Sequence, residues 1–258
     1  MIDLNFLSGV YIWLTYFAAA IFIIGVLIKI IVYAKTPMPV KIALTPAPQT
    51  KAGSVGRIAS EVLLFKSLFR ANKPTWVAGY IFHASFIVLI LLHFARHFVY
   101  SYHDGVVTLP SWYPLFVNGG IVCGVLMFLS LFYLLFRRMI VDRVRIISLF
   151  SDYLILIILM MIAVTGLSMN FLISASALTK IDNRLDPFIT GIGIFHPINI
   201  PSNPYFLVHY SLILILVAYI PFSKVMHFVG ILFSPTRYMT DNPEEKRYFK
   251  PDAEDLSL

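Results

Sequence analysis

Charge and cysteine are both scarce in this sequence. Charged residues make up 13% of the 258 residues and apolar residues 59%, whereas a soluble domain has about 25% charged and about 45–50% apolar residues. This composition excludes an ordinary water-soluble domain. The single cysteine, Cys123, lies in an apolar run and excludes a disulfide, a zinc ribbon and a covalently attached c-type haem. Iron–sulfur clusters are excluded too, so we expect Cys123 to pack in the core and any electron carrier to be non-covalent.

Long apolar segments are what the sequence has in abundance. Five of them lie near residues 11–32, 76–100, 115–136, 147–172 and 205–228. Each has about the 20 residues that a bilayer crossing needs. The first residues, MIDLNFLSG, have neither a basic stretch nor a small-residue cleavage site, which favours a retained span over a signal peptide. The expected fold is an all-α membrane protein, a five-transmembrane-helix bundle forming a single domain over residues 1–258.

Lysine and arginine are concentrated in alternate connections. The positive-inside rule places such connections in the cytoplasm, so we expect the N-terminus outside and the C-terminus in the cytoplasm. The net charge of +7 is then a topology signal, and no nucleic-acid partner is expected. The basic residues on the predicted cytoplasmic side are Lys35, Lys41, Lys51, Arg57, Lys66, Arg70, Lys73, Arg137, Arg138, Arg143, Arg145, Arg237, Lys246, Arg247 and Lys250.

The connections differ in composition. The predicted cytoplasmic loop 34–75 begins with the proline-rich TPMPVKIALTPAPQ and continues as the amphipathic RIASEVLLFKSLF. That stretch is either an interfacial helix or docking face for a cytoplasmic partner, or a solvated connector. The outer loop 173–204 is rich in Asn, Asp, Pro and Gly and is expected to form a lid over the outer face. Residues 229–258 form a cytoplasmic tail.

Four of the seven histidines lie within the predicted spans, His83 and His93 on the second and His209 and His227 on the fifth. Ionisable side chains in a bilayer are costly and by default indicate function. Ligation of a haem by two histidines needs one imidazole from each of two helices. Because the second and fifth spans are antiparallel, His83 is expected level with His227 near the cytoplasm, and His93 level with His209 nearer the outside.

The spacing of these histidines leaves one choice open. His83 and His93 are about 15 Å apart along a helix, whereas His209 and His227 are about 27 Å apart. Tilted haems and a kink at Pro221 would absorb this difference. His97 lies closer than His93 to the helical face of His83. Spacing alone therefore does not decide between His93 and His97.

These residues carry a resemblance to a known family. The pattern FHASFIVLILLHFARH on the second span, followed by His209 and His227, resembles the membrane cytochrome b family of the respiratory nitrate reductase gamma subunit. The preceding LFKSLFRANKPTWVAGYIFH is more similar to the branch found in dissimilatory sulfite reductase-associated membrane complexes and in membrane-bound heterodisulfide reductase. The resemblance covers all five spans.

The resemblance implies a di-haem cytochrome b subunit of a respiratory complex in a bacterial or archaeal cell membrane. It implies two haem b groups, with His83 and His227 on the inner iron and His93 and His209 on the outer iron. It also implies that a quinol, menaquinol or methanophenazine in its reduced form, is oxidised near the outer haem. Electrons would pass to a cytoplasmic iron–sulfur subunit, with sulfur-compound reduction as the expected outcome, and further membrane or outer-face subunits are possible partners.

Other polar residues are candidates for contacts with the haems. Arg96, three residues after His93, is placed to pair with an outer haem propionate or to extend to the lipid headgroups. Lys224, Arg138 and Arg70 are the corresponding candidates for the inner haem, or are topology signals. Glycines also recur near the histidines, where they would allow either haem approach or helix packing. They are Gly79, Gly119, Gly120, Gly124 and Gly166.

Quinol oxidation needs a group that accepts protons. His97, His103, Asp104 and His196 lie at or beyond the outer ends of the spans, and histidine titrates in a useful range. Each is alternatively an ordinary interfacial residue. The acidic and lysine residues of the family's quinol site have no clear match here, so the quinol contacts do not follow from the resemblance.

A second hypothesis is a haem-free membrane transporter or a scaffold that anchors a cytoplasmic enzyme. Transporters commonly have internal repeats, and no repeat is apparent in this sequence. Anchoring does not require four histidines within the membrane. The sequence does not identify the quinone, the terminal acceptor, the direction of electron flow or the oligomeric state.

Overall fold

The computed structural model describes residues 5–37, 46–99, 101–103, 106–108, 111–173, 185, 187–234 and 239–241. Within these ranges, five helices are long and apolar enough to cross a bilayer. They are α1 (Phe6–Lys35), α4 (Lys73–Val99), α5 (Tyr113–Ile140), α7 (Phe150–Leu172) and α9 (Pro204–Tyr219). The predicted five-helix membrane fold is therefore confirmed.

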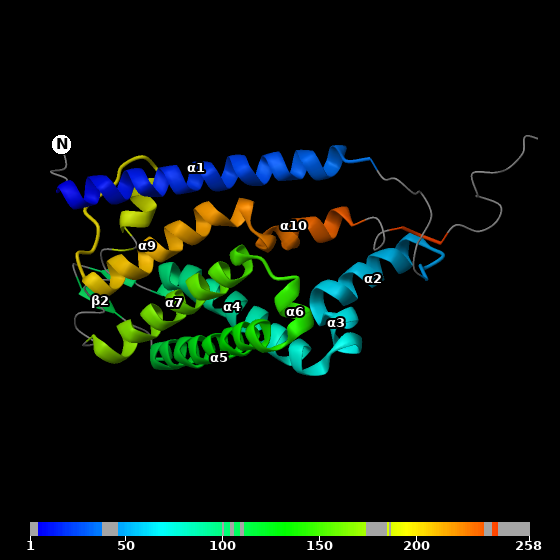
Figure 1. Ribbon diagram of the computed structural model, residues 1–258. Coiled ribbons are helices and arrows are strands. Elements are labelled where there is room, and N and C mark those ends of the chain that lie inside the picture. Colours follow the sequence, from blue (N-terminus) through cyan, green and yellow to red (C-terminus); the bar gives the residue numbers. More distant parts are fainter. Residues whose placement is uncertain are drawn as a thin grey trace, which may run out of the picture.

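Shorter elements connect and extend these spans (Figure 1). They are α2 (Lys51–Leu64), α3 (Lys66–Ala71), β1 (Ser101–His103), β2 (Val106–Thr108), α6 (Asp142–Ile146) and α10 (His227–Gly230), with the 3-10 turns η1 (Ile220–Phe222), η2 (Lys224–Met226) and η3 (Ile231–Phe233). Strands β1 and β2 form an antiparallel hairpin in which Tyr102 pairs with Val107.

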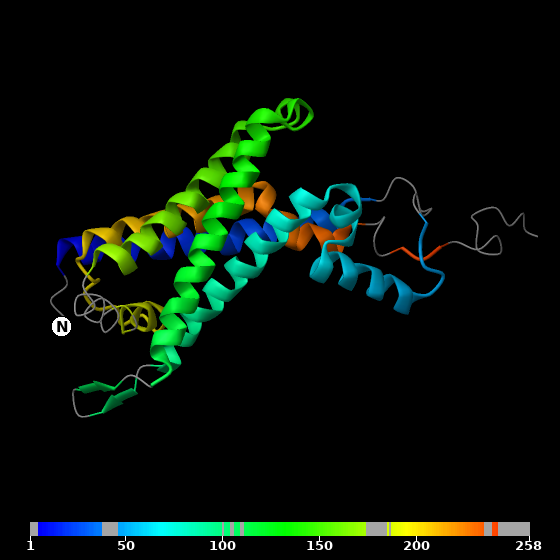
Figure 2. The ribbon, with the colours of Figure 1, turned by 90° about the horizontal axis from the view of Figure 1, so that it is seen from below.

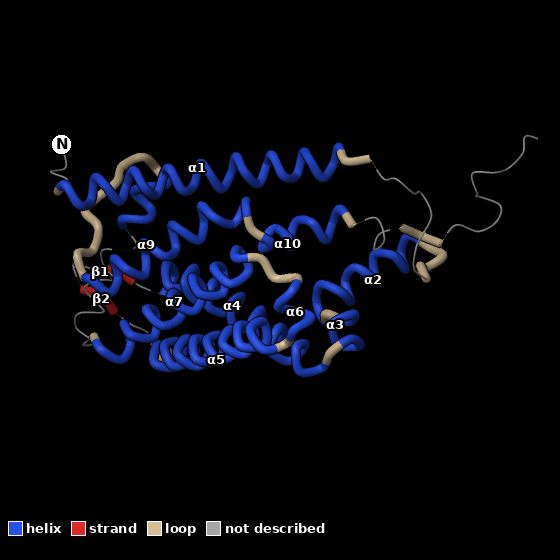
Figure 3. The backbone as a smooth tube through the Cα atoms, viewed as in Figure 1, coloured by secondary structure: helices blue, strands red, loops and turns tan. Residues whose placement is uncertain are grey.

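The bundle has two ends of different character, seen at the left and right of Figure 3. We call the end with the start of α1 and the β1–β2 strands the hairpin end. The opposite end carries α2, α3, α6 and α10, and we call it the basic end, because the connections rich in lysine and arginine lie there. Which end faces the cytoplasm stays a prediction from the positive-inside rule.

The spans pack in a sequence that differs from their order in the chain. Helix α4 packs on α5, α5 on α7, α7 on α9, and α9 on α1. Figure 2 shows α5 crossing obliquely relative to α1 and α9. Met127, Leu131, Leu159 and Leu216 form the buried core shared by α5, α7 and α9. Helix α1 is peripheral, with only 6% of its membrane window buried in the protein.

The last span is interrupted, whereas the sequence analysis extended it to residue 228. Helix α9 begins where Asn203 caps its first turn and ends at Tyr219. Pro221 has no backbone N–H and cannot continue a helix, and Ser223 is extended, with φ −107° and ψ 167°. The chain resumes as η2 and α10. We call residues 220–226 the break.

Helix α1 accommodates the break through a glycine. A Cβ atom added to Gly25 would lie 2.5 Å from Cβ of Pro221, so only glycine allows this approach. Helix α1 also packs against η1. The notch at Gly25 therefore fixes where α1 sits relative to the break.

The amphipathic stretch of the 34–75 loop folds as two helices. Phe65, with φ 48°, separates α2 from α3, and α3 packs on α4. Val55 and Leu63 on α2 are each 66% exposed. Both the docking and the connector interpretations of this segment remain open.

The described part of the outer loop packs against α1 at the hairpin end. The hydroxyl of Tyr16 donates to the carbonyl of Ile192 at 2.9 Å, and the backbone N–H of Ile200 donates to the hydroxyl of Ser8 at 3.0 Å. Phe188 and Ile200 are buried in the cluster that this packing forms. The loop thereby covers one side of the hairpin end.

Candidate haem-binding site

Four histidines lie on three helices, and the rings of His83 and His227 face each other. His83 and His93 lie on α4, His209 lies on α9, and His227 is the first residue of α10. The first three belong to membrane spans, whereas His227 is separated from α9 by the break. We call His83 and His227 the basic-end pair, and His93 and His209 the hairpin-end pair.

The two rings of the basic-end pair are close together. The ring centroids of His83 and His227 lie 5.9 Å apart, with an angle of 87° between the planes. Nδ1 of His83 bonds to the carbonyl of Gly79 at 2.7 Å, and Nδ1 of His227 bonds to the carbonyl of Lys224 at 3.1 Å. Each imidazole is thus oriented by a carbonyl within one turn of its own chain segment.

This separation matches an iron held between two imidazoles. A metal–imidazole bond of about 2 Å on each side of the metal places the two ring centres about 6 Å apart. Both residues engage Nδ1 in a hydrogen bond, so Nε2 is the nitrogen that would bind iron. The basic-end pair therefore fits a haem with two axial histidines.

The aromatic surroundings of His83 are well defined. The ring of Phe65 meets that of His83 edge-on at 4.9 Å, and Phe82 does so at the same distance. Phe65 is the residue that separates α2 from α3 and so brings the 34–75 loop to the basic-end pair. Such apolar contacts restrict the rotation of the imidazole and exclude water.

The hairpin-end pair is oriented differently. Nδ1 of His93 bonds to the carbonyl of Leu89 at 2.7 Å, whereas Nδ1 of His209 bonds to the hydroxyl of Thr165 on α7 at 2.9 Å. His209 is 7% exposed and interacts electrostatically with His93. A Cβ atom added to Gly166 would lie 3.2 Å from Cε1 of His209, so this glycine admits the imidazole.

The packing of the helices also suits a group held between the pairs. Helix α4 packs chiefly on α5 and α3, and α9 packs chiefly on α7 and α1. Helices in direct contact have axes about 8–10 Å apart, which leaves no space between them for a flat macrocycle. Helices α4 and α9 are not main packing neighbours of each other, so their histidines can lie on either side of such a group. The basic-end pair therefore fits a haem in both donor chemistry and helix arrangement.

Comparison with known proteins shows the family of this chain. The family model described as nitrate reductase gamma subunit matches residues 60–248. The chain belongs to the nitrate reductase gamma subunit family. Membership agrees with the resemblance in the sequence and, with the five apolar helices, makes the chain a multi-pass membrane protein.

Two relatives extend the comparison over most of the chain. The Hdr-like menaquinol oxidoreductase cytochrome b-like subunit of Archaeoglobus profundus is 31% identical over 282 residues, covering 92% of this chain and 81% of the relative. The protein of the same name from Archaeoglobus fulgidus is 29% identical over 279 residues, covering 94% of this chain and 83% of the relative. Alignments of this coverage include at least part of α1, which the nitrate reductase gamma subunit model does not match.

Two of the three candidates for inner propionate contacts have another partner. Lys224 Nζ lies 2.6 Å from Oδ2 of Asp152, and Arg138 Nη1 lies 3.5 Å from the same oxygen. Arg70, on α3, is exposed. The carboxylate of Asp152 therefore already draws two of these cations together.

The remaining sequence-based candidates fall partly outside the described residues. The side chains of Arg96, His97 and His103 and the whole of Asp104 lie outside them. The backbone of His103 ends β1 at the hairpin end. His196 lies in the outer loop, where its backbone N–H donates to the carbonyl of Gly191 at 2.7 Å. The quinol site of this family member stays a prediction.

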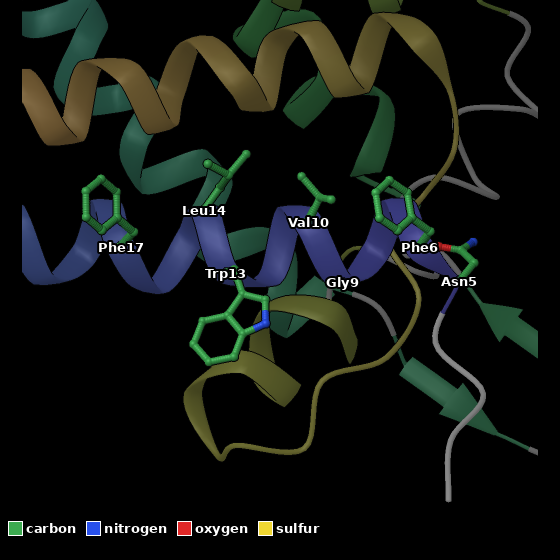
Figure 4. A pocket seen from close by; sticks show the side chains of 7 residues that line it. All are labelled: Asn5, Phe6, Gly9, Val10, Trp13, Leu14 and Phe17. Atoms are coloured by element: carbon green, nitrogen blue, oxygen red, sulfur yellow. The ribbon is translucent and has the colours of Figure 1, made fainter.

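A shallow groove of about 690 Å³ runs along the first turns of α1 and contains none of the four histidines. In Figure 4, Val10 and Leu14 project to one side of α1 and Trp13 to the other. The groove is lined by Asn5, Phe6, Gly9, Val10, Trp13, Leu14 and Phe17. Asn5 has the only amide side chain in this lining, and its oxygen accepts the N–H of Ser8 at 2.8 Å. The rest of the lining is almost entirely apolar, as expected of a lipid-facing surface.

Two residues of the site were missed by the sequence analysis. Thr165 carries no signal in one sequence, because hydroxyls in membrane helices commonly bond to their own backbone. Asp152 does carry a signal, since an acid at the start of a span is costly and by default functional. Its partner Lys224 lies 72 residues away, so the pairing itself required the fold.

Proposed function

We propose that this chain is the di-haem cytochrome b subunit of a respiratory menaquinol oxidoreductase. Menaquinol is oxidised at the hairpin end, and electrons cross the membrane to a partner at the basic end. The relatives from Archaeoglobus, whose names include menaquinol oxidoreductase and cytochrome b-like subunit, support this proposal.

The approach of His83 to His227 is the observation that carries the proposal. Two imidazoles 5.9 Å apart, each with Nδ1 bonded to a carbonyl, are what axial ligation of a haem iron by two histidines requires. The hairpin-end pair adds to this support, because His209 is buried and Gly166 leaves space for its ring.

The histidine pairs support electron transfer as the function of this chain. A haem b held by two of these histidines would supply one-electron chemistry. The residues of the chain orient the imidazoles, exclude water and hold the two sites at different depths. His83 and His93 are ten residues apart on α4, so the sites are about 15 Å apart along the helix.

Each menaquinol gives up two electrons and two protons, so the hairpin end needs proton acceptors. His97, His103 and Asp104 are our proposed acceptors, because His97 lies in the last turn of α4 and the other two follow α4 in the sequence. Histidine titrates near neutral pH, and a carboxylate passes the proton onward. Arg96 is our proposed partner for a propionate of the outer haem.

A cytoplasmic iron–sulfur subunit is the electron acceptor that we propose at the basic end, with reduction of a sulfur compound as its chemistry. With the basic end in the cytoplasm, electrons move inward while protons leave outside. Movement of one charge against 100 mV stores about 2.3 kcal/mol. The reaction therefore contributes to the membrane potential.

The first test is a dithionite-reduced minus oxidised spectrum with haem quantification on the purified chain. We expect about two b haems in the wild type, loss of one in His93→Ala, and none lost in His97→Ala. Loss in His97→Ala alone would move the outer ligand to His97. Absence of haem from the wild type after haem-supplemented expression would refute the proposal and favour a haem-free transporter or scaffold.

The second test follows the electrons. A menaquinol analogue added to the oxidised protein should reduce both haems, and a quinol-site inhibitor should block this reduction. Reduction that is insensitive to the inhibitor, or no reduction by the quinol, would refute quinol oxidation and leave the haem assignment intact.

A further inference from the structure

Asp152 is a buried carboxylate at the basic end. Its side chain is 3% exposed, at the start of the span α7. Oδ2 accepts from Lys224 Nζ at 2.6 Å and from the backbone N–H of Leu149 at 3.0 Å, and lies 3.5 Å from Arg138 Nη1. One carboxylate oxygen thus joins the end of α5, the start of α7 and the segment after α9.

Arg138 has a second contact in the same place. Its Nη1 donates to the hydroxyl of Ser148 at 2.8 Å, just before α7. The Asp152 carboxylate is 3% exposed, whereas Lys224 is 59% exposed. Removing a partner from a buried charge is destabilising, so the buried carboxylate depends on its contacts with Lys224 and Arg138.

Lys224 is held at both its side chain and its backbone. Its Nζ bonds to Asp152, and its carbonyl accepts from Nδ1 of His227 at 3.1 Å. A displacement of Lys224 therefore moves the acceptor that sets the orientation of the His227 imidazole.

The break makes this connection necessary. Helix α9 ends at Tyr219, so helical continuity does not determine where His227 lies relative to His83. The contacts that position the segment instead include the approach of Pro221 to Gly25 and the ion pair of Lys224 with Asp152. Of these, the ion pair is the one closer along the chain to His227.

We propose that Asp152 is a positioning residue for the basic-end haem, acting through Lys224 to fix the orientation of the His227 imidazole. The inference rests on the proposed function, in which His83 and His227 ligate iron. It assigns Lys224 and Arg138 to Asp152 and not primarily to a haem propionate.

Two properties of the haem report on this role. The electron paramagnetic resonance spectrum of a ferric haem with two imidazoles depends on the angle between the ring planes, which is 87° for His83 and His227. The midpoint potential depends on the hydrogen bond to Nδ1 and on nearby charge. Loss of the Asp152 charge alone would shift the potential, but a clamp that only stabilises helix ends would leave the electron paramagnetic resonance signal unchanged in a protein that keeps both haems.

The experiment compares Asp152→Asn with Asp152→Glu and Asp142→Asn in the full-length haem-loaded chain. Asp142 is the matched control, because it lies at the same end in an exposed ion pair with Arg145. In Asp152→Asn we expect a changed low-spin signal and a raised midpoint potential for the basic-end haem, with the hairpin-end haem unchanged. Asp152→Glu should restore both properties towards the wild type, and Asp142→Asn should have no effect.

The outcomes separate the two proposals. No haem in the wild type refutes the proposed function. Two haems with unchanged spectra and potentials in Asp152→Asn overturn the positioning role alone, as does equal loss of both haems. If Asp152→Asn does not accumulate, Lys224→Met decides, because it removes the same connection while Arg138 still faces Asp152. An unaltered basic-end haem in Lys224→Met would overturn the inference.

Discussion

The two histidine pairs are positioned by different means. At the hairpin end, His209 lies on the continuous helix α9 and bonds to a hydroxyl of the neighbouring helix α7. At the basic end, His227 lies beyond a break in the helix and bonds to a carbonyl three residues away. Helix geometry and one neighbour suffice at the hairpin end, whereas an ion pair and a glycine notch replace helix continuity at the basic end.

This difference explains how one helix serves both sites. On α4 the two histidines are about 15 Å apart, whereas an unbroken helix would place His209 and His227 about 27 Å apart. The break ends α9 at Tyr219 and restarts the chain, so His227 need not lie where an unbroken helix would place it. We infer that the basic end depends on polar contacts that the hairpin end does not need.

Removing one ligand from each end should have the largest effect. We expect His227→Ala and His209→Ala each to lower haem content from about two to about one per chain. Only His209→Ala should also abolish reduction of the remaining haem by a menaquinol analogue, because quinol oxidation is proposed at the hairpin end. Optical titration measures both properties. Loss of quinol reduction in His227→Ala alone would reverse the assignment of the two ends.

A methyl group at Gly166 should disturb the hairpin-end pair selectively. Its Cβ would lie 3.2 Å from Cε1 of His209, and overpacking of this kind costs about 1–3 kcal/mol. We expect Gly166→Ala to lower occupancy of the hairpin-end haem, as measured by haem quantification. Gly119→Ala is the control, since a Cβ there meets nothing within 4 Å. Equal haem content in both variants would contradict the prediction.

Thr165→Val should change the hairpin-end haem without removing it. The substitution keeps the side-chain shape and removes the hydroxyl that bonds to His209. A hydrogen bond of about 1 kcal/mol corresponds to about 40 mV for one electron. We expect the midpoint potential to rise by this order, because a weaker bond at Nδ1 makes the imidazole a poorer donor to ferric iron. Thr165→Ser should behave like the wild type in the same redox titration.

The smallest effect is expected at an exposed acid of the basic end. Asp142 is 75% exposed and pairs with Arg145 at 2.8 Å, and exposed pairs contribute about 0–1 kcal/mol. Asp142→Asn should therefore leave unfolding in detergent and both haem potentials nearly unchanged. A loss of stability comparable to that in Asp152→Asn would show that burial does not distinguish the two acids.

The membrane fold was predictable because apolar runs and spans have matching lengths. The polar contacts of the candidate site were less predictable from the sequence. Pro221 predicted a kink, but the extended Ser223 that completes the break depends on local packing. Thr165 and Asp152 acquire their roles from partners distant in sequence, which spacing does not reveal. His93 and His97 are not separated by spacing, and the side chain of His97 lies outside the described residues, so His93 stays a prediction.

The notch at Gly25 links membrane thickness to the basic end. Helix α1 has 30 residues and is about 45 Å long, whereas the hydrocarbon core is about 30 Å thick. A free helix meets a thinner bilayer by sliding or tilting alone. Because Pro221 occupies the notch, α1 cannot slide without moving the break. A change in the depth of α1 in the lipid would therefore also shift His227 along the membrane normal.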